Sequence, residues 1–201
     1  MKNIYILITI SIITLSSCKA QNAPLYRIDR DNPEGTHFKD LDNDLSDFVG
    51  AWKWQSNDSI VSIEFQKWED IIFEDTNQYE DMLVGAYKFT VNGTVIQDYM
   101  SQLEENSIYI YEHNIVGNTI LHKGQYPKCT ECTDDERQVF VYFTDPEREY
   151  LNSAIVLRHK VDNGIEKMNV ILYQFENSFL PSVDAPKQNR IPFGEYTFIK
   201  Q

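Results

Sequence analysis

The sequence predicts an all-β fold, an antiparallel up-and-down meander that closes into a β-barrel or a strongly curled sheet. From residue 50 onward, apolar and polar residues alternate in short runs that are rich in β-branched and aromatic side chains, with turn residues between the runs. No segment after residue 49 repeats apolar residues over the length of a helix, which argues against a parallel sheet with crossover helices. The 201 residues include 11 Phe, 12 Tyr and 3 Trp, enough bulky side chains for one large core.

The first segment of the chain predicts export. Lys2 precedes an apolar run from Ile4 to Leu15, which is shorter than the roughly 20 residues that a membrane-spanning helix needs. We therefore interpret residues 1–17 as a signal peptide. The tetrapeptide Leu15-Ser16-Ser17-Cys18 resembles the lipobox of bacterial lipoproteins, and this resemblance implies that Cys18 becomes a lipidated, palmitate-bearing first residue that holds the protein on the lipid bilayer. The alternative is an ordinary secretory leader with an incidental cysteine.

The residues that follow Cys18 indicate where the protein is held. Lys19 stands where lipoproteins of the inner membrane often carry Asp, so the resemblance implies the outer membrane. Residues 19–22 lack the acidic side chains that often signal surface display, which favours the periplasmic face and leaves surface exposure open. Residues 18–36 are polar, contain Pro and Gly, and predict a flexible tether, while residues 37–201 form the single domain.

A short helix is expected just before the first strand. Leu41, Leu45, Phe48 and Val49 recur at the spacing i, i+4, i+7 and i+8, which predicts an amphipathic helix whose intervening aspartates face water.

The strands follow from the period of two. We expect ten of them, separated by turns, over residues 50–56, 60–68, 82–91, 94–99, 107–113, 118–123, 137–144, 153–161, 166–175 and 195–199. So many sequential strands expose two long edges unless the sheet curls or closes, which favours a barrel.

Two Asn-Gly pairs set the expected registers. A two-residue type I′ turn at 92–93 places Val91 opposite Thr94 and Phe89 opposite Ile96. The same turn at 163–164 joins two strands whose opposed residues are Ile155 and Leu172, Leu157 and Val170, and His159 and Met168.

The start of the first strand carries a family resemblance. Phe48-Val49-Gly50-Ala51-Trp52 resembles the Gly-x-Trp opening of the lipocalin and fatty-acid-binding-protein superfamily, which implies a lipocalin-like barrel whose Trp closes one end beneath a helix. A late basic residue packs on that Trp in the superfamily, and Arg190 is the expected match. The segments SCKAQ, FVGAWKW and LVGAYKFTVNG resemble an uncharacterised domain family of bacterial lipoproteins over most of the chain; that resemblance implies topology and location but no activity.

In an up-and-down meander alternate loops lie at the same end, which predicts one acidic end. The connections 69–81, 100–106 and 124–136 are expected together, opposite 57–59, 92–93 and 114–117. The acidic rim, our name for the candidate interaction residues at the first end, consists of Glu69, Asp70, Glu74, Asp75, Glu131 and Asp134. Clustered negative charge attracts a cationic partner or a divalent metal, and the alternative is a solvated rim.

Cys129 and Cys132 remain once Cys18 is assigned to lipid. An oxidising compartment favours a disulfide between them, with free or redox-active thiols and a metal pair as the alternatives. Neighbouring acidic residues disfavour thiolates, and zinc would need two more ligands than this spacing supplies.

No catalytic motif or phosphate-binding glycine loop is present, and His37, His113, His122 and His159 form no constellation with Ser or Cys. We therefore predict a protein that is not an enzyme and has no cofactor or metal. The formal net charge of −13 excludes nucleic acid as a partner. The leading hypothesis is an envelope lipoprotein that binds a small apolar or amphipathic ligand inside the barrel. The alternatives are an inhibitor-like module whose acidic rim binds a basic protein, and glycan binding through exposed aromatic side chains.

Overall fold

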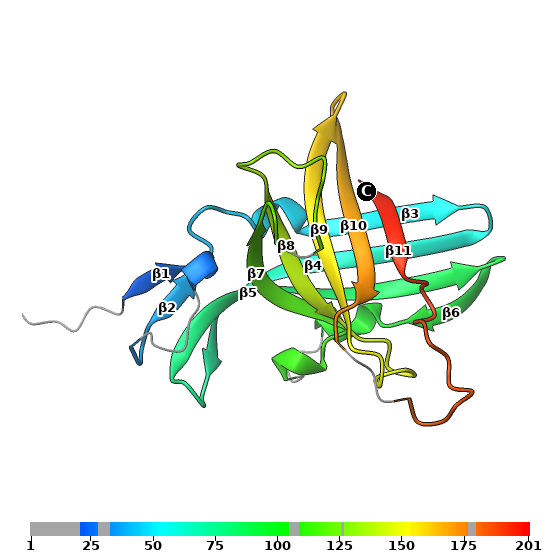
Figure 1. Cartoon of the computed structure of the whole chain (residues 1–201), viewed down its shortest axis with the longest axis horizontal. Helices are drawn as coiled ribbons and strands as arrows, with labels where there is room; N and C mark the ends of the chain where they lie inside the picture. The colour runs from blue at the N-terminus through cyan, green and yellow to red at the C-terminus, as the bar shows by residue number, and fades with distance from the viewer. Residues whose placement is uncertain (1–20, 28–32, 105–108, 126, 177–179) are drawn as a thin grey trace, which may run out of the picture.

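The chain folds into a closed antiparallel β-barrel of eight strands (Figure 1). The computed structural model describes residues 21–27, 33–104, 109–125, 127–176 and 180–201. Around the barrel the strands follow the order β5-β4-β3-β11-β10-β9-β8-β7, and β7 pairs again with β5. Their bounds are β3 Gly50–Ser56, β4 Ser59–Phe73, β5 Gln78–Val91, β7 Ile115–His122, β8 Arg137–Phe143, β9 Ser153–Asp162, β10 Ile165–Gln174 and β11 Gly194–Lys200. The predicted all-β barrel is confirmed.

Three short strands lie outside this ring. β6 (Thr94–Asp98) forms a hairpin with the last part of β5, while β1 (Asn22–Pro24) and β2 (His37–Lys39) pair in parallel and add to its first part. Strand β5 therefore pairs with different neighbours along its length. Among the described residues, no helix is long and apolar enough to cross a membrane.

The barrel closes where β5 meets β7, and two glycines of this junction lie tightly against the neighbouring strands β8 and β4. Leu83 pairs with Gly117, and Gly85 pairs with Ile115. A Cβ atom on Gly117 would lie 2.8 Å from the Cα atom of Val141, and one on Gly85 would lie 2.7 Å from the ring of Phe65. Neither distance is compatible with a larger side chain, so these positions require glycine.

The inward-facing side chains form one continuous core. Aromatic residues from different strands meet in it, and the largest fully buried ones are Trp52, Tyr87, Phe38, Phe65 and Phe198. The pKa of Tyr87 is raised, first by burial and then by the charge of Asp145. The space in which an apolar ligand was expected is thus occupied by side chains at these positions.

Trp52 closes the barrel end at which β3 begins. Its Nε1 donates a hydrogen bond of 2.7 Å to the carbonyl oxygen of Phe48, and Lys200 Nζ lies 5.4 Å from the centroid of its ring. The expected basic partner, Arg190, is wrong, because Arg190 forms an ion pair with Glu147. Lys200 takes this place because it is paired with Trp52 across β3 and β11.

The short α-helix expected over 41–49 is wrong. Within the described residues this segment forms only a 3-10 turn, η2 (Ser46–Phe48). Asn43 has a left-handed backbone with φ of 61°, which a continuous helix does not allow. The carboxylate Oδ2 of Asp40 accepts a hydrogen bond from the backbone N–H of Leu45, so a side chain takes the place of a helical carbonyl.

The strand expected over 107–113 is wrong in its described part. Residues Ile110–Glu112 form the 3-10 turn η4. Ile110 and His113 are buried, whereas Tyr109 and Tyr111 are exposed. Buried residues three positions apart suit a 3-10 turn better than the alternation of a strand.

The two predicted hairpin registers differ in outcome. The register around 163–164 is confirmed, with all three expected pairs present. Around 92–93, Val91 pairs with Thr94 as expected, but a bulge then places Phe89 opposite Gln97. Ile96 is therefore 40% exposed and Gln97 is buried, the reverse of the expected arrangement.

The predicted tether, residues 18–36, contacts the barrel in its described part. Residues 22–24 pair with β2, and the side chain of Leu25 is buried in the main core. The short 3-10 turn η1 (Leu25–Arg27) follows β1 directly. This segment is therefore ordered against the barrel close to residue 22, rather than only after residue 36.

We predict that replacing the closing tryptophan destabilises the barrel strongly. Trp52→Ala removes a fully buried ring and its hydrogen bond, so it should lower the free energy of unfolding by about 3–5 kcal/mol. Urea denaturation followed by circular dichroism measures this change. Tyr109→Ala, at a side chain that is 61% exposed, is the control. Equal midpoints for the two variants would contradict the structural role given to Trp52.

Candidate metal site

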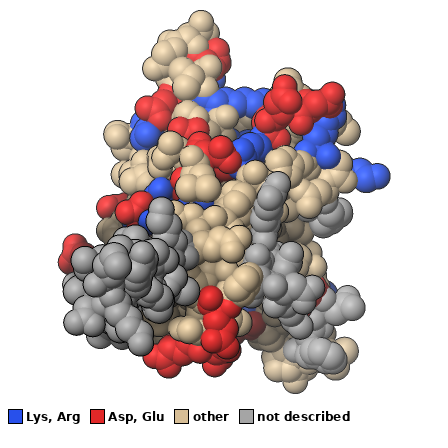
Figure 2. All heavy atoms as spheres, turned by 90° about the vertical axis from the view of Figure 1, so that its left-hand side faces the viewer, with Lys and Arg blue, Asp and Glu red and all other residues tan. Residues whose placement is uncertain are grey.

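The residues of the acidic rim lie in different surroundings, and several of them are paired with basic side chains. Glu74 and Asp75 lie exposed at the tip of the β4–β5 hairpin. Asp134 accepts from Lys123 Nζ at 2.7 Å, and Glu131 accepts from Arg158. Figure 2, which views the side of the molecule that carries β1 and β2, shows Lys and Arg among Asp and Glu in the upper half of this face. The described part of the rim is therefore no continuous negative surface.

The connection 100–106 was expected beside 69–81, and its described part, residues 100–104, packs on the outside of the barrel wall. The 3-10 turn η3 (Met100–Glu104) packs Leu103 in a cluster with Met82 and Val84, which face outward from β5. The apolar face of this segment thus covers the outside of the barrel wall. The prediction assumed that every strand joins the ring, whereas β6 and the turn η3 that follows it lie outside the ring.

Arg158 holds the connection between β7 and β8 to the barrel. Its side chain is only 5% exposed, and its Nε donates to Glu136 Oε1 at 2.6 Å. A second nitrogen, NH1, donates to Glu131 Oε1 at 3.1 Å. The hydrogen bond from Arg158 lowers the pKa of Glu136 below its ordinary value of 4.5, against the effect of burial.

The cysteines of this connection are joined by a disulfide between Cys129 and Cys132. Cys132 is buried, and Gln138 Nε2 lies 3.0 Å from its Sγ. The bond leaves neither thiol available as a metal ligand. Cys18, the predicted lipidation site, lies outside the described residues.

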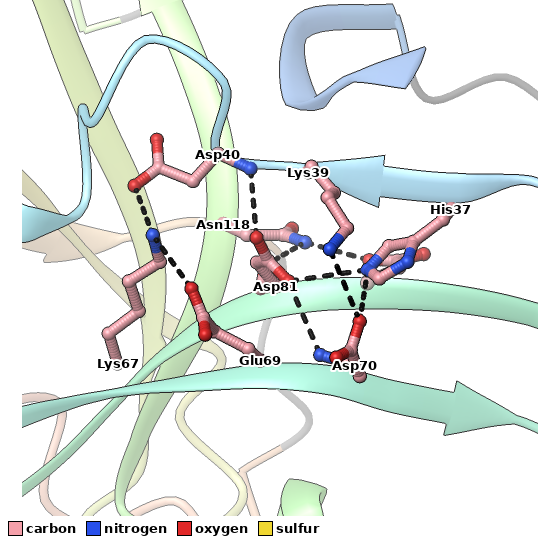
Figure 3. Close-up of polar contacts among 9 residues, drawn as sticks. His37, Lys39, Asp40, Lys67, Glu69, Asp70, Asp81 and Asn118 are labelled. Atoms are coloured by element: carbon pink, nitrogen blue, oxygen red, sulfur yellow. Dashed lines mark hydrogen bonds and ion pairs between the residues drawn. The ribbon is translucent and has the colours of Figure 1, made fainter. Parts of the chain in front are cut away.

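Two rim residues and their neighbours form a polar cluster where β2 meets the β4–β5 hairpin (Figure 3). His37 Nε2 lies 2.9 Å from Asp70 Oδ1 and 3.4 Å from Asp81 Oδ1. These three donor atoms all lie within 4.8 Å of one another. Within the described residues, this is the one group of at least three His, Cys, Asp or Glu side chains placed so that they could share a metal ion.

Backbone geometry brings these three side chains together. Asp70 sits in a bulge of β4 between Trp68 and Ile71, with a left-handed backbone (φ 60°) that breaks the regular alternation. β2 adds to β5 in parallel, with His37 paired to Tyr79, two residues before Asp81. The bulge and the parallel pairing therefore direct donors from β2, β4 and β5 to one point.

Asp81 is the anchor of the cluster. It is only 3% exposed, and its Oδ2 accepts a hydrogen bond of 3.0 Å from the backbone N–H of Asp40. Its Oδ1 accepts one of 3.3 Å from the backbone N–H of Asp70. The two backbone hydrogen bonds hold the carboxylate in one orientation, so a ligand at Oδ1 meets a preorganised oxygen.

Asn118 supports Asp81 from β7. Its Nδ2 donates to the carbonyl oxygen of Asp81 at 3.0 Å and to Glu80 Oε2 at 2.7 Å. Burial raises the pKa of Glu80, and the hydrogen bond from Asn118 opposes this rise. Asn118 therefore holds β5 through the backbone of Asp81 and through the side chain of Glu80.

Two lysines compensate part of the negative charge. Lys67 Nζ lies 3.1 Å from Asp40 Oδ2 and 3.4 Å from Glu69 Oε1, and Lys39 Nζ lies 3.6 Å from Asp70 Oδ1. Burial would lower the pKa of Lys67, but its hydrogen bond to Asp40 and the surrounding carboxylates raise it. The ion-paired carboxylates are Asp40, Glu69, Asp70 and Asp81.

Glu80 adds a fifth carboxyl group beside Asn118, so five carboxyl groups face two ammonium groups in the cluster. This excess of acidic groups favours a bound cation.

The donor set has the chemistry of a transition-metal site, and the two distances from His37 are close to those between zinc ligands. Imidazole nitrogen and carboxylate oxygen bind Zn²⁺ at about 2.0–2.2 Å, so two tetrahedral ligands lie roughly 3.3 Å apart. The distances of 2.9 and 3.4 Å from His37 Nε2 bracket this spacing. The side chain of Asp70 is 62% exposed, which gives an ion access from solvent and leaves room for a water ligand.

The other histidines lack this convergence. His159 lies near Asp47 and Glu166, but it faces them with different ring nitrogens. His113 is buried against the ring of Trp68, and burial lowers its pKa. Both rings are therefore placed as parts of the packing, and neither shares one donor site with two carboxylates.

The tryptophans do not form an exposed row. Trp52 is buried, Trp54 packs on Tyr196, and Trp68 packs on His113. The tryptophans therefore contribute no row of solvent-facing rings, whereas Tyr109, Tyr111 and Tyr142 are exposed. Glycan binding through exposed aromatic side chains stays a prediction.

Comparison with known proteins yields one family. Residues 1–201 match DUF6705, described as a family of unknown function. No curated protein matches, and no solved structure matches.

We predict that Glu136→Gln destabilises the protein in a pH-dependent way. Its carboxylate pairs with a nearly buried Arg158, so the variant should lose about 1–3 kcal/mol at pH 7. Because the folded pKa is lowered, this stabilisation is complete above the ordinary value of 4.5 and is lost as the pH falls through the folded value. Urea denaturation between pH 3 and 7 measures the difference.

The matched control for this prediction is Glu131→Gln, which changes a partner of the same arginine that is 70% exposed. It should cost less than Glu136→Gln at pH 7. A Glu136→Gln effect that stays constant down to pH 3 would contradict the role of this ion pair.

Proposed function

The chain belongs to DUF6705, a family of unknown function, and we propose that it is a binding protein for a divalent transition-metal ion, held by His37, Asp70 and Asp81. The observation that carries this proposal is the convergence of three donor atoms within 4.8 Å of one another. His37 on β2 is distant in sequence from Asp70 and Asp81, which lie on the β4–β5 hairpin, and His37 and Asp81 are buried. The proposal concerns binding and includes no reaction.

The surroundings of the cluster support a bound cation. Backbone hydrogen bonds orient Asp81, and the cluster holds more carboxyl groups than ammonium groups. A cation bound between the carboxylates would reduce their mutual repulsion.

The ligands expected from the sequence have less support. A small apolar ligand would need space in the barrel, where Trp52, Tyr87 and Phe65 are fully buried. A basic protein would need a continuous acidic surface, whereas Asp134 and Glu131 are paired within the chain. The metal proposal uses Asp70 of the acidic rim together with two residues outside it.

We also propose that the barrel is a lipoprotein, held at the outer membrane by lipid on Cys18 and facing the periplasm. The lipobox resemblance of Leu15-Ser16-Ser17-Cys18 supports the anchor, and Lys19 supports the choice of membrane. The parallel pairing of β1 brings the ordered chain close to this anchor, since β1 begins at Asn22.

We predict that the full chain in detergent binds Zn²⁺ with one ion per protein, and that Asp70→Asn and His37→Gln each weaken this binding at least tenfold, about 1.4 kcal/mol. Both changes remove a donor and keep the size of the side chain. Isothermal titration calorimetry at pH 7 measures the affinity. The affinity of the unchanged chain should fall as the pH is lowered, because protons compete with a metal ion for its ligands.

The control for the metal titration is Asp134→Asn, which removes an exposed rim carboxylate outside the cluster. It should bind Zn²⁺ as tightly as the unchanged chain. Circular dichroism of each metal-free variant checks that the barrel has formed. Equal Zn²⁺ affinity in all three variants would refute the site.

We predict that Cys18→Ser abolishes lipidation. Cells expressing the full chain and supplied with labelled palmitate should incorporate label into the unchanged protein and not into the variant, because the serine offers no thiol for thioether formation. Cys129→Ser with Cys132→Ser is the matched control and should keep the label. Membrane fractionation gives the second readout, and a variant that remains bound to the outer membrane would contradict the proposed anchor.

A further inference from the structure

A hollow in the protein surface lies beside the last residues of β8 and β10, and it contains none of the metal-cluster residues. Its volume is about 320 Å³, at the lower end of the range of small-molecule sites. The residues that define its chemistry are Tyr142, Glu149, Phe175 and Glu176. No residue of β2, β4 or β5 is among the described residues that line it, so the hollow is separate from the junction of β2 with β5.

Two aromatic rings form a corner in this hollow. The ring centroids of Tyr142 and Phe175 lie 5.9 Å apart with an angle of 77° between the planes. Phe140 is packed beneath both, with centroids 5.2 Å from Tyr142 and 5.0 Å from Phe175. Tyr142 is 49% exposed and Phe175 is 40% exposed, although Phe140 is buried. The supporting ring fixes two exposed rings that would otherwise be free to move.

The charge of the hollow is negative. Glu149 and Glu176 are exposed, and no Lys or Arg belongs to the described residues that line the hollow. The net charge of −13 adds a long-range attraction for cations. An anionic ligand would be repelled on both counts.

We propose that this hollow binds a small organic cation with a quaternary ammonium group. Aromatic faces attract weakly hydrated cations, and the two carboxylates supply the opposite charge. A sugar ring stacks best on a flat platform, and two rings that meet at 77° form a corner instead. A metal ion would need donor atoms in contact with it, whereas a trimethylammonium group needs a corner of rings and nearby negative charge. This site is independent of the metal proposal.

Choline and its neutral isostere 3,3-dimethylbutan-1-ol test this proposal. The full chain in a detergent without a choline group is titrated with each compound and followed by two-dimensional amide NMR. Choline should shift the amide signals of Tyr142, Thr144 and Phe175 with saturation. The isostere should bind about tenfold more weakly, because it has the same shape and no charge.

Substitutions in the hollow give a second measurement. Tyr142→Leu and the double change Glu149→Gln with Glu176→Gln should each weaken choline binding at least threefold, whereas Tyr109→Leu and Glu195→Gln, at exposed positions outside the hollow, should not. A dispersed amide spectrum shows that each variant is folded. Equal binding of choline and its isostere, or unchanged choline binding in the hollow variants, would overturn the proposal.

Glycerophosphocholine distinguishes two sources of the same ammonium group. Tighter binding than choline supports recognition of the group as a lipid headgroup, and weaker binding supports a free solute, because the phosphate is repelled by the carboxylates.

Discussion

The carboxylate of Asp81 joins the segment after β2 to both strands of the β4–β5 hairpin. One of its oxygens accepts the backbone N–H of Asp40, which follows β2, and the other accepts that of Asp70 in the bulge of β4. A buried carboxylate is stable only when it is well hydrogen-bonded, and here backbone groups satisfy it. The attachment of β2, the shape of the β4–β5 hairpin and the geometry around His37 therefore depend on this one side chain.

Local patterns predicted the barrel strands, and non-local constraints explain most of the errors. Trp52 and the hairpin at 163–164 lie in regular alternation, so their strands were found with nearly correct bounds. A bulge adds one residue and reverses the inward and outward positions beyond it, which is why Ile96 was expected to be buried. β1 and β2 have three residues each, too few to show a period, and their parallel pairing carries no turn signal.

The candidate metal site likewise combines a residue that a local sequence pattern indicates with residues that only non-local contacts bring together. Asp70 belongs to an acidic run that the sequence displays openly, and it was named as a candidate contact residue. His37 and Asp81 lie in unrelated surroundings in the sequence, and only the pairing of β2 with β5 brings them together. The expectation of no metal came from the absence of a spaced motif. A site whose ligands would come from three strands has no such motif, so no pattern in the sequence indicates it.

The pairing of β3 with β11 has a consequence for folding. Trp52 is opposite Lys200, and the backbone N–H of Gln201 donates to the carbonyl oxygen of Ala51 at 2.9 Å. The first strand of the ring therefore keeps an open edge until β11 has paired with it. Contacts between residues so far apart in the chain form slowly. During that interval β3 exposes an unpaired edge, which makes the incompletely folded chain prone to aggregation.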